Sequence, residues 1–424
     1  MQESADLISS PIGVLAVLCT VAAFFFLLAE VTKAKLFNYI PPLLFIYATP
    51  VFLNNLNVIP AESPIYSSMS TYVLPAFIVL MLIKVDIPAV VRVMGKGVWV
   101  MLMGTLGVFV GAVVSYAIVH RWLPEDAWTG VGALAGSWIG GTANMAATAD
   151  MLETSPEMFG LAVVADNVIY LVWLPLLLAS RDFAERFNRW ARVSPDRVRL
   201  MEEAAESYTE EDHPPTMPQY LYLFSIVAIV TWLGIALAPI LAPFFGDVAA
   251  AAARILEGLP QVWYVQYTLG VIYAVPFALS GETTMRILLV TTIALLLSMT
   301  RVSKLPNTTA LGTALVYVFV AAMGAKASLA GLGDAPVFVL MAFIWIAIHG
   351  LFCLAGAWLF KVDVHSVAIA SAANIGAAAS APIVAAHHRP SLVPVAVLMA
   401  LLGYAMGNYV APFAGKAARF VAGM

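Results

Sequence analysis

Charged residues are scarce in this sequence. Aspartate, glutamate, lysine and arginine together make up 11% of its 424 residues, whereas a soluble domain carries about 25%. This scarcity excludes an ordinary soluble domain, and a net charge of −4 gives no indication of nucleic-acid binding. Hydrophobic residues make up 62% of the chain, its mean hydropathy is +0.91, and long apolar runs recur along almost its whole length. Runs of about 20 apolar residues cross a bilayer as helices, so the sequence predicts an all-α polytopic membrane protein.

Cysteine and catalytic motifs are also sparse. The two cysteines, Cys19 and Cys353, both lie inside apolar runs and are expected to be small buried side chains. The sequence has no glycine-rich phosphate loop, no cluster of metal ligands and no nucleophile elbow. Its one long polar stretch is too short to form an ATPase domain. We therefore expect neither an enzyme nor a bound cofactor, and primary active transport by this chain alone is excluded.

The apolar runs divide into two sets of five around a polar stretch at 181–218. The expected spans are about 11–29, 37–53, 66–83, 97–119 and 157–180, then about 219–242, 284–300, 307–325, 335–360 and 391–414. A further stretch, 260–282, is ambiguous, because counting it as a span leaves the balance of basic residues unchanged. Five spans per half would give an inverted repeat, so we predict ten spans and treat 244–282 as an extracellular insertion. Its aromatic residues, Trp263 and Tyr264 among them, suit the membrane interface.

Lysine and arginine set the orientation, because cytoplasmic loops carry an excess of both. With the N-terminus outside, the six arginines between 181 and 199 fall inside, and the loop 54–65, which has no basic residue, falls outside. We therefore expect a multi-pass protein of the inner, cytoplasmic membrane whose linker 181–218 is cytoplasmic.

Two features are expected on the inner face. Phe183, Phe187 and Trp190 lie on one helical face with arginines beside them, which predicts an amphipathic helix on the membrane surface. The sequence His387-His388-Arg389 is expected in a loop on the same side, with a role in the entry of anions.

Two stretches differ in composition from an ordinary spanning helix. The first, 136–150, has the sequence GSWIGGTANMAATAD, and the second, 371–382, has the sequence SAANIGAAASAP. Both are rich in small residues, carry scattered polar side chains and are interrupted by glycine, and each precedes the last span of its half. Superimposing Ile139-Gly140 on Ile375-Gly376 brings the prolines of the two closing spans within one residue of each other. Paired interrupted segments at matching places in two halves are typical of a transporter's binding site.

The broken segments supply neutral candidates for binding. A broken helix exposes N–H groups where one half begins and carbonyls where the other ends. The first kind of end attracts carboxylates, and the second coordinates Na⁺ beside neutral side-chain oxygens. The simpler alternative is close helix packing through small residues. The candidates are Ser137, Gly140, Gly141, Thr142, Asn144, Asn374, Gly376 and Ser380.

Four more polar residues complete the candidate site. Asp150 closes the first broken segment, Asp166 and Asn167 lie within the span 157–180, and Asn408 lies within the last span. An aspartate inside a span is costly and indicates function by default. Asp166 is therefore the first candidate for a carboxylate that couples transport to H⁺ or Na⁺. Asn167 and Asn408 are expected to face the centre, and Asp150 is equally well explained as a capping residue.

Segments 136–147, 371–376 and 401–409 resemble the signature of the YjcL-like family of bacterial and plastid membrane proteins. The resemblance covers most of the chain and is most specific in the two broken segments. That family is distantly similar to sodium/glutamate symporters and to the cation–proton antiporter and anion-transporter superfamily. The resemblance therefore implies an inverted repeat, a scaffold domain, a mobile core domain holding the broken segments, and elevator-type alternating access. The alanine run 377–379, where more Gly and Thr is expected, and the insertion 244–282 depart from the pattern and leave the substrate open.

Together these features predict an elevator-type secondary active transporter. It would couple Na⁺ or H⁺ to the movement of a small anionic or zwitterionic metabolite such as an amino acid, peptide or carboxylate. The first repeat would be 1–180 and the second 219–424. The core would be 97–180 with 335–414, and the remaining spans would form a scaffold that also forms a homodimer. The expected partners are the lipid bilayer and a small-molecule substrate, with no nucleic acid and no metal other than Na⁺.

Two alternatives stay open. The first is a cation/proton antiporter that exchanges ions at Asp166. It would collapse a proton gradient when Na⁺ or K⁺ is added without an organic substrate, whereas a symporter would not. The second is a membrane sensor or assembly factor, which would need no polar cavity and would have a dry, fully packed centre.

Overall fold

The computed structural model describes residues 6–33, 37, 42–85, 95–194, 214–257, 279–327 and 333–423. Every regular element within these residues is a helix. In chain order the elements are α1 (Pro11–Thr32), α3 (Pro42–Asn55), α4 (Pro64–Ser68), η1 (Met69–Val73), α5 (Leu74–Leu82), α7 (Gly97–Val119), η2 (His120–Trp122), α8 (Ala127–Met151), α9 (Pro156–Ala179), η3 (Ser180–Phe183), α10 (Ala184–Trp190), α12 (Met217–Glu257), α14 (Glu282–Ser298), η4 (Arg301–Lys304), α15 (Thr308–Ala325), α16 (Ala335–Phe360), α17 (Val364–Ile375), α18 (Ala377–His388), η6 (Pro390–Leu392) and α19 (Val393–Val421).

Eight helical stretches in the described residues are long enough, at 18 residues or more, and apolar enough to cross a membrane. The chain is therefore a multi-pass helical membrane protein, as its composition predicts. Two other expected spans, α3 and α14, are shorter, with 14 and 17 residues. The total of ten spans accordingly stays a prediction.

Two expected spans, 97–119 and 335–360, coincide with α7 and α16, but α12 differs from its expectation. α12 continues to Glu257 instead of ending near residue 242, because five consecutive alanines at 249–253 favour helix. The expected insertion therefore begins as helix. Its interfacial aromatic residues and most of the ambiguous stretch 260–282 lie outside the described residues.

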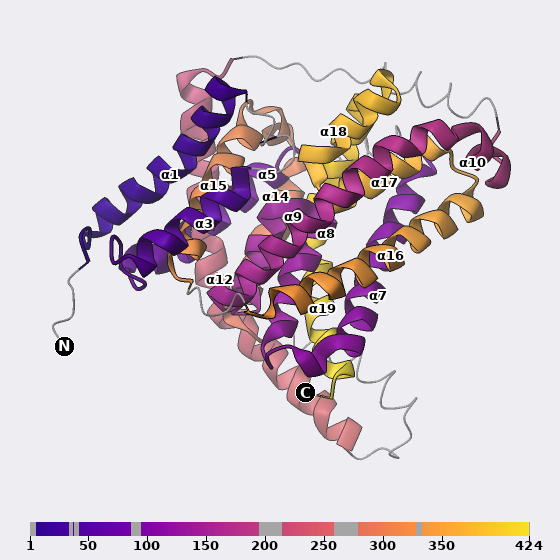
Figure 1. Ribbon diagram of the computed structural model, residues 1–424. Coiled ribbons are helices and arrows are strands. Elements are labelled where there is room, and N and C mark those ends of the chain that lie inside the picture. Colours follow the sequence, from indigo (N-terminus) through magenta and orange to yellow (C-terminus); the bar gives the residue numbers. More distant parts are fainter. Residues whose placement is uncertain are drawn as a thin grey trace.

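The helices pack in two bundles, which lie side by side in Figure 1. The first bundle consists of α1, α3, α4, α5, α12, α14 and α15, and the second bundle consists of α7, α8, α9 and α16 to α19. Contacts are extensive within each bundle, whereas the bundles meet through smaller contacts such as those of α3 with α9 and α14 with α19. One of the two cysteines departs from expectation: Cys353 in α16 is buried, but Cys19 is exposed on α1 at the edge of the first bundle.

The two halves of the chain pack by one pattern. α3 contacts α15 as α14 contacts α5, and α1 contacts α15 as α12 contacts α5. Likewise α9 contacts α16 as α19 contacts α7. In each comparison the helices hold corresponding positions in the two halves of the chain. α14, for example, is the counterpart of α3, and α5 is the counterpart of α15. Equivalent helices therefore make equivalent contacts.

The start of the polar linker forms the short helices η3 and α10. Phe183 and Trp190 are exposed there, in keeping with the expected amphipathic pattern. α10 is held against the second bundle, because the backbone N–H of Val364 in α17 donates to Asn188 Oδ1 at 3.1 Å. His387 and His388 are the last residues of α18 and not part of a loop. Linker residues 195–213 lie outside the described residues.

Candidate functional site

The expected break in α8 is present. Gly140 (φ −143°, ψ 21°) and Gly141 (φ 74°, ψ −174°) leave helical geometry in the middle of the helix. The Gly141 conformation is one that essentially only glycine adopts, because a Cβ atom would clash with the local backbone. The glycine pair therefore divides α8 into two arms.

The two arms of α8 fold back on each other as a helical hairpin, which we call the first hairpin. A Cβ atom placed on Gly136 in the first arm would lie 2.6 Å from the carbonyl oxygen of Asn144 in the second arm. At the open end, Thr154 Oγ1 donates to the Thr129 carbonyl at 3.4 Å. Both ends of the segment therefore lie on the same side, and the break is the tip of the hairpin.

α17 and α18 form the second hairpin. Its tip is Gly376 (φ −133°, ψ 6°) followed by Ala377, which has a positive φ of 46°. Ser380 Oγ holds the tip closed by donating to the Ala372 carbonyl at 2.8 Å. At the base, His365 Nδ1 near the start of α17 lies 3.0 Å from His388 Nδ1 at the end of α18.

The tips of the two hairpins touch. A Cβ atom on Gly141 would lie 2.9 Å from Ala377 Cβ. Their bases contact opposite ends of α9: Thr154 of the first base stands just before this helix, and His388 Nε2 of the second base donates to the Leu177 carbonyl near its end at 2.9 Å. The two hairpins therefore approach each other from the two ends of α9 and meet between them.

Asp166 on α9 faces the first hairpin. Ser137 Oγ donates to its Oδ2 and Trp138 Nε1 donates to its Oδ1, both at 2.9 Å. Ser137 and Trp138 belong to the first arm, immediately before the break. One turn later on α9, the Tyr170 ring lies against the second tip, since its Cε2 would be 3.2 Å from a Cβ on Gly376. α9 thus contacts both tips.

The two asparagines of the broken segments have different surroundings. Asn144 Nδ2 donates to the Tyr404 carbonyl of α19 at 3.0 Å, and Asn374 Nδ2 donates to Thr105 Oγ1 of α7 at 2.9 Å. Asn374 Oδ1 is buried and has no hydrogen-bond partner among the described residues. A buried acceptor without a partner is rare in proteins and indicates a bound ion, water or other donor. Thr142, next to Gly141, is partly exposed.

Three predicted residues bond away from the tips. Asp150 pairs with Arg286 of α14 at 3.4 Å across the seam between the bundles. Asn408 Nδ2 donates to Thr291 Oγ1 of the same helix α14 at 3.0 Å. Asn167 Nδ2 donates at 2.7 Å to the carbonyl four residues earlier on its own helix. The Nδ2 groups of Asn167 and Asn408, which were expected to face the centre, therefore donate away from the tips, while Asn408 Oδ1 is buried and has no hydrogen-bond partner among the described residues.

Sequence reasoning missed a hydrogen-bonded chain beside the second hairpin. Trp173 Nε1 donates to Ser371 Oγ, which lies 2.9 Å from His349 Nε2. His349 Nδ1 lies 2.9 Å from the Gly104 carbonyl. Because a carbonyl only accepts, Nδ1 carries the proton and Nε2 accepts from Ser371. The chain joins α9, α17, α16 and α7. In the sequence it was indicated only by Ser371, within a stretch of unusual composition, and by His349, a histidine inside an expected span.

Comparison with known proteins agrees with the resemblance carried by the broken segments. Residues 16–420 match the family described as "Protein of unknown function (DUF819)". The chain is also 27% identical over 377 residues, 87% of each chain, to the "Uncharacterized membrane protein YjcL" of Bacillus subtilis (strain 168). The predicted YjcL-like relationship is thereby confirmed. Since the family match covers nearly the whole chain, this protein belongs to the DUF819 family.

Proposed function

We propose that this protein is a secondary active transporter that couples Na⁺ or H⁺ to the movement of a small anionic or zwitterionic metabolite. The observation that carries the proposal is the contact between the two hairpin tips at Gly141 and Ala377. Four half-helix ends come together there, away from the hairpin bases. Such ends attract carboxylates through their N–H groups and coordinate cations through their carbonyls.

Side chains beside the tips suit this role. Asp166 supplies a carboxylate whose described partners, Ser137 and Trp138, are both neutral. A carboxylate without a cationic side chain beside it is suited to take up a proton or Na⁺. Asn374 Oδ1, buried and without a described partner, supplies a neutral oxygen of the kind that hard cations prefer. The substrate would lie at the half-helix ends of both tips.

Two features support an inverted repeat and elevator-type movement. The hairpins approach from opposite ends of α9, and the two halves of the chain make matching helix contacts. In this proposal the second bundle is the mobile core and the first bundle is the scaffold, which also carries a homodimer interface. Ten spans, an external N-terminus and a cytoplasmic linker in the inner membrane complete the arrangement.

Replacement of Asp166 by asparagine tests the coupling role. Asp166→Asn keeps the shape of the side chain and removes its charge, so uptake driven by a Na⁺ or H⁺ gradient into proteoliposomes is expected to fall by at least about 100-fold. The substrate would first be found by a thermal-shift screen of amino acids, dipeptides, keto acids and dicarboxylates, with and without Na⁺. Asp126→Asn is the matched control, because Asp126 accepts from Ser155 at the hairpin base, far from the tip. Unchanged uptake by folded Asp166→Asn protein would refute the coupling role.

A cation/proton antiporter is the second candidate, and the neutral surroundings of Asp166 favour it. An antiporter would collapse a pH gradient in proteoliposomes when Na⁺ or K⁺ is added with no organic substrate, and a symporter would not. If neither assay gives transport and no compound in the screen binds, the membrane sensor or assembly factor becomes the better hypothesis.

A further inference from the structure

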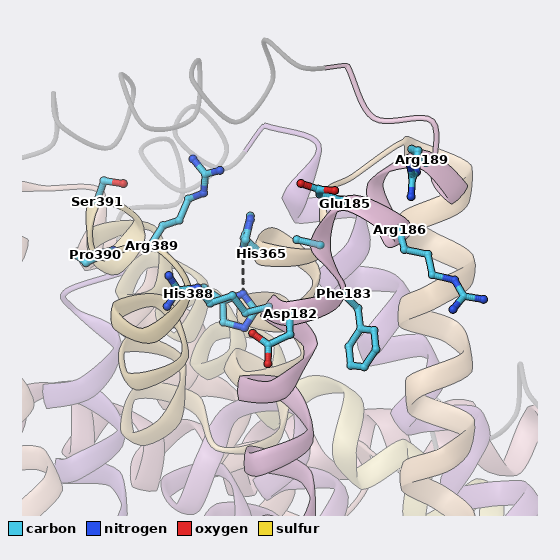
Figure 2. Close-up of a pocket in the computed structure, with 12 residues that line it drawn as sticks. Asp182, Phe183, Glu185, Arg186, Arg189, His365, His388, Arg389, Pro390 and Ser391 are labelled. Atoms are coloured by element: carbon cyan, nitrogen blue, oxygen red, sulfur yellow. Dashed lines mark hydrogen bonds between the residues drawn. The ribbon is translucent and has the colours of Figure 1, made fainter.

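A second polar site lies at the base of the second hairpin. The structure has a cavity of about 730 Å³ there, between η3 and α10 on one side and the ends of α17 and α18 on the other. His365 stands eleven residues before the hairpin tip at Gly376, about 16 Å along a helix. Figure 2 shows the side chains that line the cavity. The cavity is therefore separate from the site at the tips.

Positive charge predominates in this cavity. Four arginines line it, against the two carboxylates of Asp182 and Glu185. Arg389 and Arg181 approach the histidine end, where Arg181 Nη1 donates to the His387 carbonyl at 2.7 Å. The other two arginines extend away from the histidines in Figure 2 and form the rim. A cavity of this size and charge suits an anionic group attached to a larger molecule.

The histidine pair in the cavity has a defined protonation pattern. His388 Nε2 carries a proton because its partner at 2.9 Å is the Leu177 carbonyl. In a neutral His388, Nδ1 is then an acceptor, so His365 Nδ1, at 3.0 Å, must be the donor. His365 Nε2 is left with a lone pair and forms no hydrogen bond to another described residue. It can accept one proton without disturbing the pair, whereas protonation of His388 Nδ1 would break the hydrogen bond between the rings.

We propose that this cavity binds a phosphate- or sulfate-type oxyanion group together with one proton on His365 Nε2. The oxyanion is held by Arg389 and Arg181, and the protonated imidazole donates to it as a third partner. The proton comes from solvent as the anion enters, and no bond other than N–H is formed. The oxyanion belongs either to a lipid headgroup or to a free phosphorylated compound.

Proton uptake follows from the charges that face His365. Burial, together with the positive charges of Arg389 and Arg181, lowers the pKa of His365, while Asp363 acts in the opposite direction. His388 on α18 also faces the ring, and Asp182 on η3 lines the same cavity. A bound oxyanion offsets the arginine charge and raises the pKa of His365. Between the two pKa values binding takes up a proton, so affinity rises as pH falls through that window and levels off below the lower value.

Sulfate is the probe for the first measurement, because it does not titrate near neutral pH. Binding to the purified full-length protein in detergent would be followed by calorimetry at constant ionic strength. We expect sulfate affinity to rise, by at most about tenfold per pH unit, as the pH is lowered from about 7 towards the pKa of His365 itself, about 4. His365→Gln should bind more weakly and lose this pH dependence, and Arg389→Gln should weaken binding by at least about tenfold.

Arg301→Gln is the matched control, since Arg301 is an exposed arginine of η4 and does not line the cavity. This variant should bind sulfate as tightly as the unmodified protein does. Nanodiscs of phosphatidylcholine with or without phosphatidylglycerol identify the source of the oxyanion. If sulfate binds in phosphatidylcholine nanodiscs but not in those that contain phosphatidylglycerol, the natural oxyanion is a lipid headgroup. If sulfate binds equally in both, the natural oxyanion belongs to a free compound. The proposal is overturned if no sulfate binds and phosphatidylglycerol does not stabilise the protein, or if Arg389→Gln binds as tightly as Arg301→Gln. Because transport is not measured, this test is independent of the proposed transport function.

Discussion

The two hairpins reach the same contact with different residues at their tips. The first hairpin turns on two glycines and places Gly141 at a φ of 74°. The second turns on Gly376 and Ala377, and the alanine takes a φ of 46°. A left-handed conformation costs an L-residue about 1–2 kcal/mol relative to glycine. The second hairpin therefore holds strain in its backbone that the first avoids.

The polar contacts of the hairpins differ as well. In the first hairpin, Ser137 and Trp138 donate to a carboxylate. In the second, Asn374 donates to the neutral hydroxyl of Thr105. Under the superposition of the two breaks, the residue opposite Ser137 is Ala373, which has no donor. The polar side chains just before the first break therefore contact a carboxylate, whereas the asparagine just before the second break donates to a neutral hydroxyl.

The largest effect on stability is expected from Gly141→Ala. Its φ and ψ are nearly exclusive to glycine, and the new Cβ would be 2.9 Å from Ala377 Cβ, so we expect a loss of about 1–3 kcal/mol from the backbone alone. Denaturant unfolding in detergent measures it. The double variant Gly141→Ala with Ala377→Gly should regain the stability lost through the contact between the two Cβ atoms, but not the stability lost through the unfavourable φ of residue 141. A Gly141→Ala protein as stable as the unmodified protein would contradict the described tip.

A somewhat smaller loss is expected from Ser137→Ala. This change removes one of the two donors to the Asp166 carboxylate with little change in volume, and a hydrogen bond to a charged group contributes about 1.5–3 kcal/mol. Thermal unfolding would compare it with Ser115→Ala, whose buried hydroxyl contacts only its own helix at 3.4 Å. Equal losses in the two variants would show that Asp166 is uncharged or not bonded by Ser137.

The smallest effect is expected from Ala377→Gly. Relief of the positive φ gains about 1 kcal/mol, and loss of a buried methyl group costs about 0.8 kcal/mol. The net change in unfolding free energy should therefore be close to zero, in contrast to Gly141→Ala at the opposite tip. A loss as large as that of Gly141→Ala would mean that the Ala377 methyl group is essential to the contact between the hairpins.

Much of the helical organisation could be predicted from local sequence. α7 and α16 were expected to the residue, because long apolar runs end where charged or turn-forming residues begin. The breaks were placed at Gly140-Gly141 and at Gly376, because glycine adopts non-helical backbone conformations at little steric cost and these glycines lie in segments of small and polar residues. The span predicted for α12 was too short. Its alanine run is less hydropathic than a span, but alanine strongly favours helix, so the helix continues.

The side-chain partners of the site could not be predicted in the same way. Asp166 was selected because a carboxylate in an apolar helix is costly, but nothing local indicated that Ser137 and Trp138 would bond to it. Asn408 was expected, like Asn167, to face the centre, yet its Nδ2 donates to Thr291 of the other bundle. Orientation around a helix axis depends on the neighbouring helix, and that neighbour is distant in the chain.

The sequence alone determined that this protein is built of apolar helices with two interrupted segments, because hydropathy and glycine act over a few residues. Only the tertiary structure decided that these segments fold back as hairpins, touch at Gly141 and Ala377, and leave a basic cavity beside His365. The physical reason is that such contacts depend on packing between segments far apart in the chain, which no local pattern encodes.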